Sequence, residues 1–111
     1  MSLKKVEAFV RPGALKKILL ALAEVDYPGV TVSEVQGHGK QRGVKEHYRD
    51  QTTMSLLTKL KVEVIVEGSR QAQRVADAII QAARTGEYGD GKIYIYDIEK
   101  GIRIRTGEQT V

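Results

Sequence analysis

The sequence of 111 residues has no cysteine, no tryptophan, a single phenylalanine and two prolines. The absence of cysteine excludes disulfide bonds, thiolate metal sites and thiol nucleophiles, and it is typical of proteins that stay in a reducing cytoplasm. No segment approaches the roughly 20 consecutive apolar residues of a membrane-spanning helix. A chain of this length fits one globular domain, so we expect residues 1–111 to form a single domain in the cytoplasm.

A strong excess of one charge is also missing. The 18 basic and 14 acidic residues give a net charge of +4, and the basic residues are spread along the chain rather than collected in a tail. This balance is too mild to indicate a nucleic-acid partner. A solvated surface of mixed charge is the simpler interpretation.

Hydrophobic residues follow two periodicities along the chain. Short alternating or β-branched segments predict strands, and stripes at intervals of three and four residues predict helices. The predicted strands cover residues 4–10, 30–36, 60–66 and 93–96, and the predicted helices cover a run from Leu15 that Tyr27-Pro28-Gly29 ends and residues 69–84. This order predicts an α+β fold, the ferredoxin-like βαββαβ sandwich, in which two helices cover one face of a four-stranded antiparallel sheet.

The other face of that sheet needs a partner. Apolar and aromatic residues are expected there: Phe9, Ile65, Tyr94, Tyr96 and Ile98. An exposed patch of this kind more often marks an interface than free surface, so we expect a homo-oligomer. An alternative from another class stays open, a ferredoxin-like RNA-binding module that stacks bases on Tyr94 and Tyr96.

Residues 37–57 fit neither a helix nor a strand. They form a connection of about twenty residues where hairpin loops usually have two to five, so this segment is expected to be functional or disordered. Gly37 and Gly39, followed by Lys40 and Gln41, offer a short nest of backbone N–H groups, or simply a flexible entry to the loop.

Residues 85–92 contain glycines at 86, 89 and 91 and end in Lys92. Such a segment lets backbone N–H groups approach a phosphate, with the lysine as a point charge. It matches neither the Walker motif nor the dinucleotide fingerprint. The alternative is a helix C-cap at Gly86 followed by an Asp-Gly turn into the last strand.

Arg103-Ile104-Arg105 places two guanidinium groups on the same side of an extended strand, which suits the oxygens of a polyphosphate. An exposed basic edge strand that resists aggregation is an equally good interpretation. Phosphate binding is favoured by convergence, because the ferredoxin-like fold can bring this segment, residues 85–92 and Gly37–Gln41 near one another or near a neighbouring subunit.

Catalytic constellations are not evident. His38 and His47 lack the spacing of a closed zinc site, and no Ser-His-Asp or Cys-His set is suggested. The carboxylates, including Glu63, lack an obvious paired partner, so we expect Glu63 to be a hydrogen-bonding or solvent-facing residue rather than a general base. We therefore expect a ligand-binding regulator rather than an enzyme, with any hydrolysis of bound nucleotide incidental.

Several blocks of sequence resemble one known family in the right order. They are Thr31–Val35 leading into Gly37–Gly43, Glu46-His47-Tyr48-Arg49, Lys59–Glu63, Ala83–Gly86 with Gly89–Ile93, and Ile102–Glu108. Over nearly its whole length the chain resembles the PII nitrogen-regulatory signal-transduction proteins.

The resemblance implies a compact homotrimer that binds ATP or ADP in clefts between subunits. Residues 37–57 then correspond to the T-loop, residues 85–92 to the nucleotide loop and residues 101–111 to the C-terminal loop. The nucleotide residues implied by position are Thr31, Gly37, Gly39, Lys40, Gln41, Glu63, Ile65, Gly89, Asp90, Gly91, Lys92, Arg103 and Arg105. Glu63 would recognise the adenine, and the two arginines would bind the phosphates.

The same resemblance implies a second small molecule. Mg-ATP supports binding of 2-oxoglutarate in typical members, with Gln41 as a ligand of the magnesium ion. Lys59 would pair with a 2-oxoglutarate carboxylate, and Arg11 would stand nearby. These roles suit a dianion beside a divalent cation.

The expected partner of the T-loop is an ammonium transporter or a nitrogen-assimilation enzyme or regulator, which would bring the protein to the inner membrane when the partner is a transporter. The T-loop departs from the family, because it is about one residue short and has Thr52 or Thr53 in place of the tyrosine that is uridylylated. A divergent member that senses bicarbonate or adenylate state and regulates carbon metabolism or another transporter is the alternative.

Overall fold

The computed structural model describes residues 2–38, 47–48, 51–52 and 56–111. The main elements are β1 (Leu3–Val10), a 3-10 helix η1 (Pro12–Ala14), α1 (Leu15–Leu22), β2 (Thr31–Gly37), β5 (Leu57–Glu67), α2 (Ser69–Ala83) and β6 (Lys92–Ile98). Two pairs of short strands complete the set: β3 (His47–Tyr48) with β4 (Gln51–Thr52), and β7 (Gly101–Ile102) with β8 (Gln109–Thr110).

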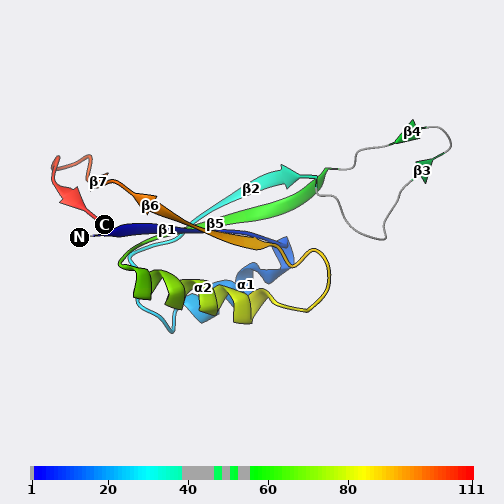
Figure 1. Ribbon diagram of the computed structural model, residues 1–111, viewed down its shortest axis with the longest axis horizontal. Helices are drawn as coiled ribbons and strands as arrows, with labels where there is room; N and C mark the ends of the chain where they lie inside the picture. Colours follow the sequence, from blue (N-terminus) through cyan, green and yellow to red (C-terminus); the bar gives the residue numbers. More distant parts are fainter. Residues whose placement is uncertain (1, 39–46, 49–50, 53–55) are drawn as a thin grey trace.

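The main sheet has the strand order β2-β5-β1-β6, and all of its neighbouring strands are antiparallel. Both α-helices cover the same face of this sheet, as Figure 1 shows. The predicted ferredoxin-like fold is therefore confirmed. Neither helix in the described part of the chain has the length and apolarity needed to cross a membrane.

The hydrophobic core lies between the sheet and the helices. Strand alternation directs Val6 and Ala8 of β1 and Val64 of β5 towards α1 and α2, where Ile18 and Val75 meet them, all fully buried. Burying an aliphatic side chain of this size contributes about 1.5–3 kcal/mol, so this layer holds the fold together.

Some boundaries differ from the predicted ones. β5 begins at Leu57, ahead of the predicted residue 60, and β2 reaches Gly37, so the two strands continue as a ribbon beyond the rest of the sheet. α1 ends at Leu22, well before Tyr27. Residues 47–48 and 51–52 pair as short strands within the segment where no strand was predicted.

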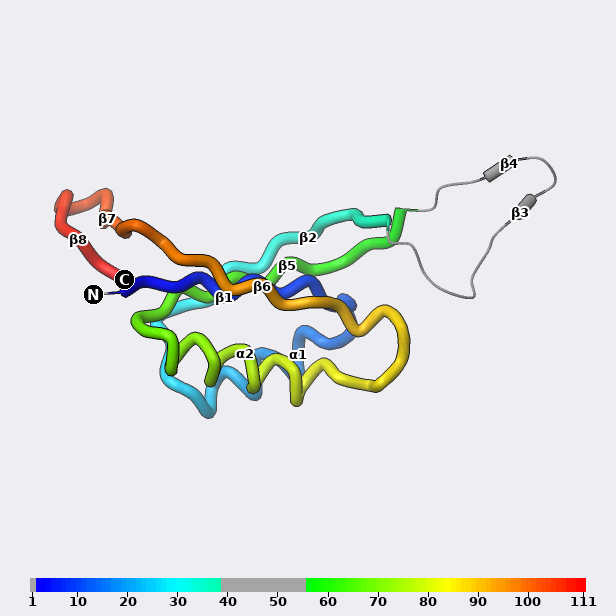
Figure 2. Tube along the Cα trace, in the orientation of Figure 1, coloured from blue at the N-terminus to red at the C-terminus, as the bar shows by residue number. Residues whose placement is uncertain are grey.

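The C-terminal segment also corrects a prediction. Arg103-Ile104-Arg105 does not lie in an extended strand, because residues 104–106 form the turn of a small hairpin between β7 and β8. The Gly107 N–H donates to the carbonyl of Arg103 at 2.7 Å, and Gly107 has a φ of 73°. This hairpin lies at the end of the sheet where the two chain termini come together (Figure 2).

The face of the sheet away from the helices carries the aromatic residues predicted for it. Registers place Phe9, Ile65 and Tyr94 on the same side as Lys5 and Tyr96. Tyr94 and Tyr96 are about half exposed. In a single chain this face is uncovered.

Candidate functional site

A cavity of about 610 Å³ opens where the end of β2, the beginning of β5 and residues 87–92 meet. Seven residues predicted from the sequence contribute to it or contact its glycine segment. Six of them line the cavity, Gly37, Lys59, Gly89, Asp90, Gly91 and Lys92, and Arg11 reaches the segment from the end of β1. Gly39, Lys40 and Gln41, including the predicted magnesium ligand, lie outside the described residues.

The segment before β6 is organised around Asp90. One carboxylate oxygen, Oδ2, accepts the backbone N–H groups of Thr85 and Gly86 at 2.8 and 2.9 Å, and Oδ1 accepts the Thr85 hydroxyl at 2.6 Å. The Thr85 hydroxyl, the Thr85 and Gly86 N–H groups and the Arg11 guanidinium lower the pKa of Asp90 to about 2. Asp90 is therefore ionised at neutral pH and fixes the course of the loop.

The end of α2 rules out the alternative interpretation of Gly86 as a helix C-cap. Gly86 is not the C-cap of α2, because the helix ends at Ala83 and its C-cap is Arg84, whose N–H bonds to the carbonyl of Ile80. Gly86 instead turns its N–H towards Asp90, with a φ of 87°.

Gly91 is required by close packing. Its φ is 105°, and a Cβ atom there would lie 1.7 Å from the carbonyl oxygen of Phe9. That separation is far shorter than any real contact, so only glycine lets β6 start its pairing with β1 at this point. The glycine segment is thereby pressed against the end of the sheet.

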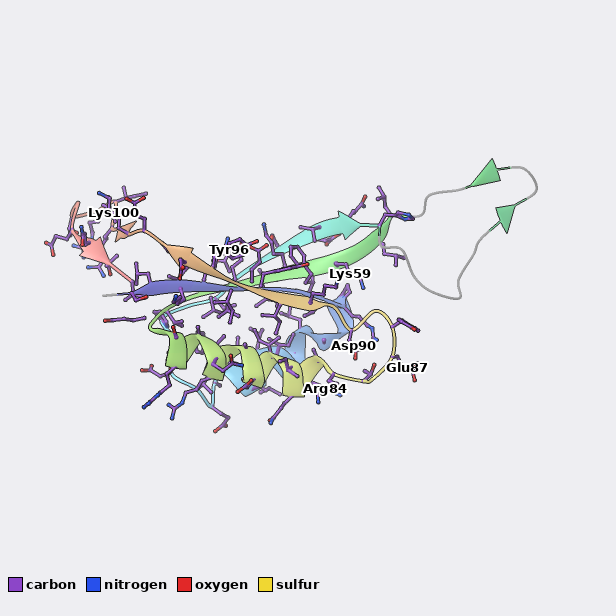
Figure 3. All side chains as sticks on the ribbon, in the orientation of Figure 1. Lys59, Arg84, Glu87, Asp90, Tyr96 and Lys100 are labelled. Carbon is purple, nitrogen blue, oxygen red and sulfur yellow. The ribbon has the colours of Figure 1, made fainter. Side chains whose placement is uncertain are left out.

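Two cations from other strands contact the same segment. Arg11 donates to Asp90 Oδ1 at 2.5 Å and to the carbonyl oxygen of Tyr88 at 3.4 Å. Lys59 Nζ donates to the carbonyl oxygen of Gly89 at 3.2 Å. The two residues that the resemblance implies for 2-oxoglutarate thus meet at one loop, and Figure 3 shows Lys59 and Asp90 at the same end of the sheet.

Apolar side chains form the rest of the cavity wall. Phe9 and Tyr94 pack edge to face with their ring centroids 6.3 Å apart, and Val35, Leu57 and Tyr88 line the same cavity. Val35, Leu57 and Tyr88 were not predicted from the sequence as lining residues. The alternation of β2 could have identified Val35, since it shares a face with Gly37.

A second group of predicted residues lies in the middle of the uncovered face. Thr31 pairs in register with Glu63, and Ile65 lies two residues further along β5. Glu63 has a partner that the sequence did not make obvious, because Lys5 Nζ is 3.4 Å from its carboxylate. None of these three residues lines the cavity at the glycine segment.

Lys5 also explains why a carboxylate can be buried on this face, which the sequence did not predict. Glu7 is buried on the uncovered face, and its Oε2 is 2.9 Å from Lys5 Nζ. The hydrogen bond to Glu7 is the main cause that raises the pKa of Lys5. The ammonium group lies 4.5 Å from the ring centroid of Tyr96. A charged network therefore runs across the centre of this face.

The third group, Arg103 and Arg105, is far from the other two. Both arginines belong to the β7–β8 hairpin, at the opposite end of β6 from the glycine segment (Figure 1). A single chain therefore does not bring the three predicted segments together.

The cavity combines features of two kinds. Aromatic and aliphatic walls suit a planar, largely apolar ring, whereas the glycine segment with Lys59 and Lys92 suits an anion. Within the described residues no cluster of three or more His, Cys, Asp and Glu side chains could hold a metal ion. The site thus fits a ligand with a ring and a negative charge.

Comparisons with known proteins agree with this geometry. A family model described as "Nitrogen regulatory protein P-II" matches residues 3–108. The chain belongs to the P-II family. P-II proteins of Microchaete diplosiphon and Nostoc punctiforme are each 52% identical to it over 108 residues, covering 96% of both chains. A solved structure described as "Structure of B. subtilis GlnK" superposes with a TM-score of 0.80 at 32% identity and covers 99% of this chain and 96% of that one.

Membership of the P-II family confirms the resemblance drawn from the sequence blocks. It also confirms the prediction of a regulatory protein rather than an enzyme, since P-II proteins are nitrogen regulators. The length of the shared sequence, nearly the whole chain, agrees with this assignment.

Proposed function

We propose that this P-II protein binds ATP or ADP in clefts between the chains of a homotrimer and transmits the bound state to partners through its T-loop, residues 37–57. The observation that carries the proposal is the cavity at the glycine segment, where Phe9 and Tyr94 lie beside Gly89, Gly91 and Lys92. A purine ring fits the aromatic side, and phosphate oxygens fit the glycine N–H groups and the lysine.

Two observations favour a cleft between chains. The β7–β8 hairpin with Arg103 and Arg105 lies at the opposite end of β6 from Lys92, so a phosphate that contacts all three residues must lie between two copies. The uncovered sheet face supplies the contact surface, because it exposes Tyr94 and Tyr96. Thr31, Glu63 and Ile65 lie on that same face and would approach the base from a neighbouring chain.

Arg11 and Lys59 favour a second, anionic effector. Both residues donate hydrogen bonds to the glycine segment, and both are partly exposed. A dicarboxylate such as 2-oxoglutarate can therefore replace these acceptors as the partner of the two cations. Magnesium would be held by the nucleotide phosphates and Gln41. The ligands act on partners only by binding two T-loop states unequally.

We expect the T-loop to contact the kinds of protein that P-II regulators control. A nitrogen-assimilation enzyme, a regulator or an ammonium transporter would be contacted by the T-loop, in the cytoplasm or at the inner membrane. The lack of cysteine suits the reducing cytoplasm.

Titration calorimetry with ATP, ADP and Mg-ATP with or without 2-oxoglutarate tests the proposal. Lys92→Ala should weaken ATP binding by about tenfold or more, the usual cost of a charge-assisted hydrogen bond. Lys17→Ala is the matched control, since Lys17 is exposed on α1, which carries no residue of the proposed site. Sedimentation should give the mass of three chains.

The possible results separate the alternatives. Heat with ATP and ADP but none with 2-oxoglutarate, together with a response to bicarbonate, would assign the divergent carbon-metabolism role. No binding of any adenylate would overturn the proposal. RNA binding by a monomer, lost when Tyr94 and Tyr96 are replaced by alanine, would assign the protein to another class.

A further inference from the structure

The β7–β8 hairpin presents one apolar side chain entirely to solvent. Ile104 is 100% exposed, although the turn that carries it is well formed. The Arg103 N–H donates to the carbonyl of Glu108 at 2.9 Å, and Gly107 donates back to Arg103. An isoleucine held on an ordered turn with no contact to its own chain suits an anchor for another surface.

A second cavity, of about 340 Å³, lies between the end of α2 and the beginning of β6. Its walls are aliphatic, with Ile79, Ile80, Ala83 and Ile93 among them. Its rim is polar and is formed by Arg84, Asp90, Gly91 and Lys92. The size and the aliphatic walls suit a branched aliphatic side chain.

Ile104 cannot reach this cavity within its own chain. The cavity is at the first residues of β6, whereas the hairpin follows the last ones. The seven residues of β6 separate them by about 20 Å at the usual rise of a strand. Figure 1 shows the hairpin and the end of α2 at opposite ends of the sheet.

We infer that Ile104 of one chain packs into the α2–β6 cavity of a second copy and anchors the hairpin there. The inference rests on the proposed nucleotide cleft between chains, and it adds the contact that holds the two arginines in place. Gly91 and Lys92 line both cavities. An anchored Ile104 therefore brings its neighbours Arg103 and Arg105 beside the glycine segment.

Charge explains why the anchor has to be apolar. Arg84 and Lys92 on the rim and Arg103 and Arg105 on the hairpin are all cations, and Asp90 is already bound to Arg11 and Thr85. Docking without an anion therefore gathers like charges, and a polyphosphate between them removes the repulsion. The packing of Ile104 supplies attraction that does not depend on the anion. ATP strengthens the docking further, because its phosphates remove the repulsion between the cations.

Because the natural chain has no cysteine, pairs of introduced cysteines can test this contact in the full chain. The double variant Ile104→Cys, Ala83→Cys should form a disulfide between chains under mild oxidation, seen as dimer and trimer bands that a reductant removes. The yield should rise with ATP. Mixing the two single variants should give the same bond, whereas Ile104→Cys combined with Ala23→Cys, on the exposed end of α1, should not.

A charge at the anchor gives a second measurement. Ile104→Asp should weaken ATP binding about tenfold or more while leaving the circular dichroism spectrum unchanged, because Ile104 is fully exposed in its own chain. Ile102→Asp is the matched control on the same hairpin, where the side chain is about half exposed. Its effect on ATP binding should be smaller.

The outcomes separate the anchor from the proposed function. A protein that is oligomeric and binds ATP but gives no disulfide in the double variant would overturn the anchor alone. A disulfide between chains without any ATP binding would support the anchor and overturn the nucleotide proposal. An equal effect of Ile104→Asp and Ile102→Asp would also count against the anchor.

Discussion

The two ends of β6 carry the two phosphate-binding segments of the proposed site, and they are built in opposite ways. Before β6, Asp90 binds Thr85, Gly86 and Arg11, and Lys59 binds Gly89, so the loop is tied to β1 and β5. After β6, the hairpin bonds mainly to itself, as in the contact of Arg103 with Thr110 at 3.3 Å.

This difference has a thermodynamic meaning. A loop fixed by its own chain loses little conformational entropy when a ligand arrives, whereas exposed arginines on a hairpin lose more. The comparison indicates that the first segment is ready to bind in each chain and that the second becomes a binding element only against a neighbour.

The strongest way to break the first segment is Gly91→Ala. The new Cβ would collide with the carbonyl oxygen of Phe9, and φ is positive, so we expect a loss of about 3 kcal/mol or more in the free energy of unfolding. Urea denaturation measures it. Gly86→Ala is the control, since it shares the positive φ but has nothing within 4 Å, and should lose only about 1–2 kcal/mol. Equal losses would contradict the close-packing explanation.

Acid should also destabilise this segment, by a smaller amount than Gly91→Ala. The pKa of Asp90 is lowered to about 2 from an ordinary value of 3.8, so the ionised carboxylate stabilises the fold above about pH 4, and this contribution is lost as the pH falls towards 2. Thermal melting between pH 5 and 2 should show a fall in Tm that is smaller in Asp90→Asn, in which the other paired carboxylates still become protonated. A variant with the same pH profile as the natural chain would show that Asp90 does not set this dependence.

A substitution in the hairpin should have the smallest effect on the free energy of unfolding. Gly107→Ala introduces strain at a φ of 73° without any clash, but the hairpin can open without disturbing the core. We expect the free energy of unfolding to change by less than about 0.5 kcal/mol, while hydrogen exchange of the Gly107 and Glu108 amides becomes faster. A global loss as large as that of Gly86→Ala would erase the contrast between the two segments.

Sequence periodicity predicted most of the fold because burial on one face dictates it. The alternation of Val62, Val64 and Val66 identified β5, and the stripe through Val75 and Ile79 identified α2. The start of β5 at Leu57 was missed because its first residues are exposed and show no alternation. Strands of two residues, such as β7, leave no periodic signal at all.

The sequence predicted which residues belong to the candidate site, but not which contacts they make with one another. Glycines and Lys92 identified the anion segment, yet its contacts with Arg11 and Lys59 depend on which strands become neighbours. The pairing of Glu63 with Lys5 depends on strand register in the same way. An extended strand was expected at Arg103 because alternation in three residues cannot be distinguished from a turn.

The unequal lengths of the strands have a mechanical consequence. Residues 57–59 of β5 pair only with residues 35–37 of β2, since β1 begins its pairing with β5 at Leu60. A ribbon of two strands twists more readily than a sheet of four. Gly37, Leu57 and Lys59 of this ribbon line the main cavity, so the shape of the cavity and the twist of the ribbon are linked. The twist sets the direction in which the chain leaves the sheet after residue 37 and returns to it at residue 57.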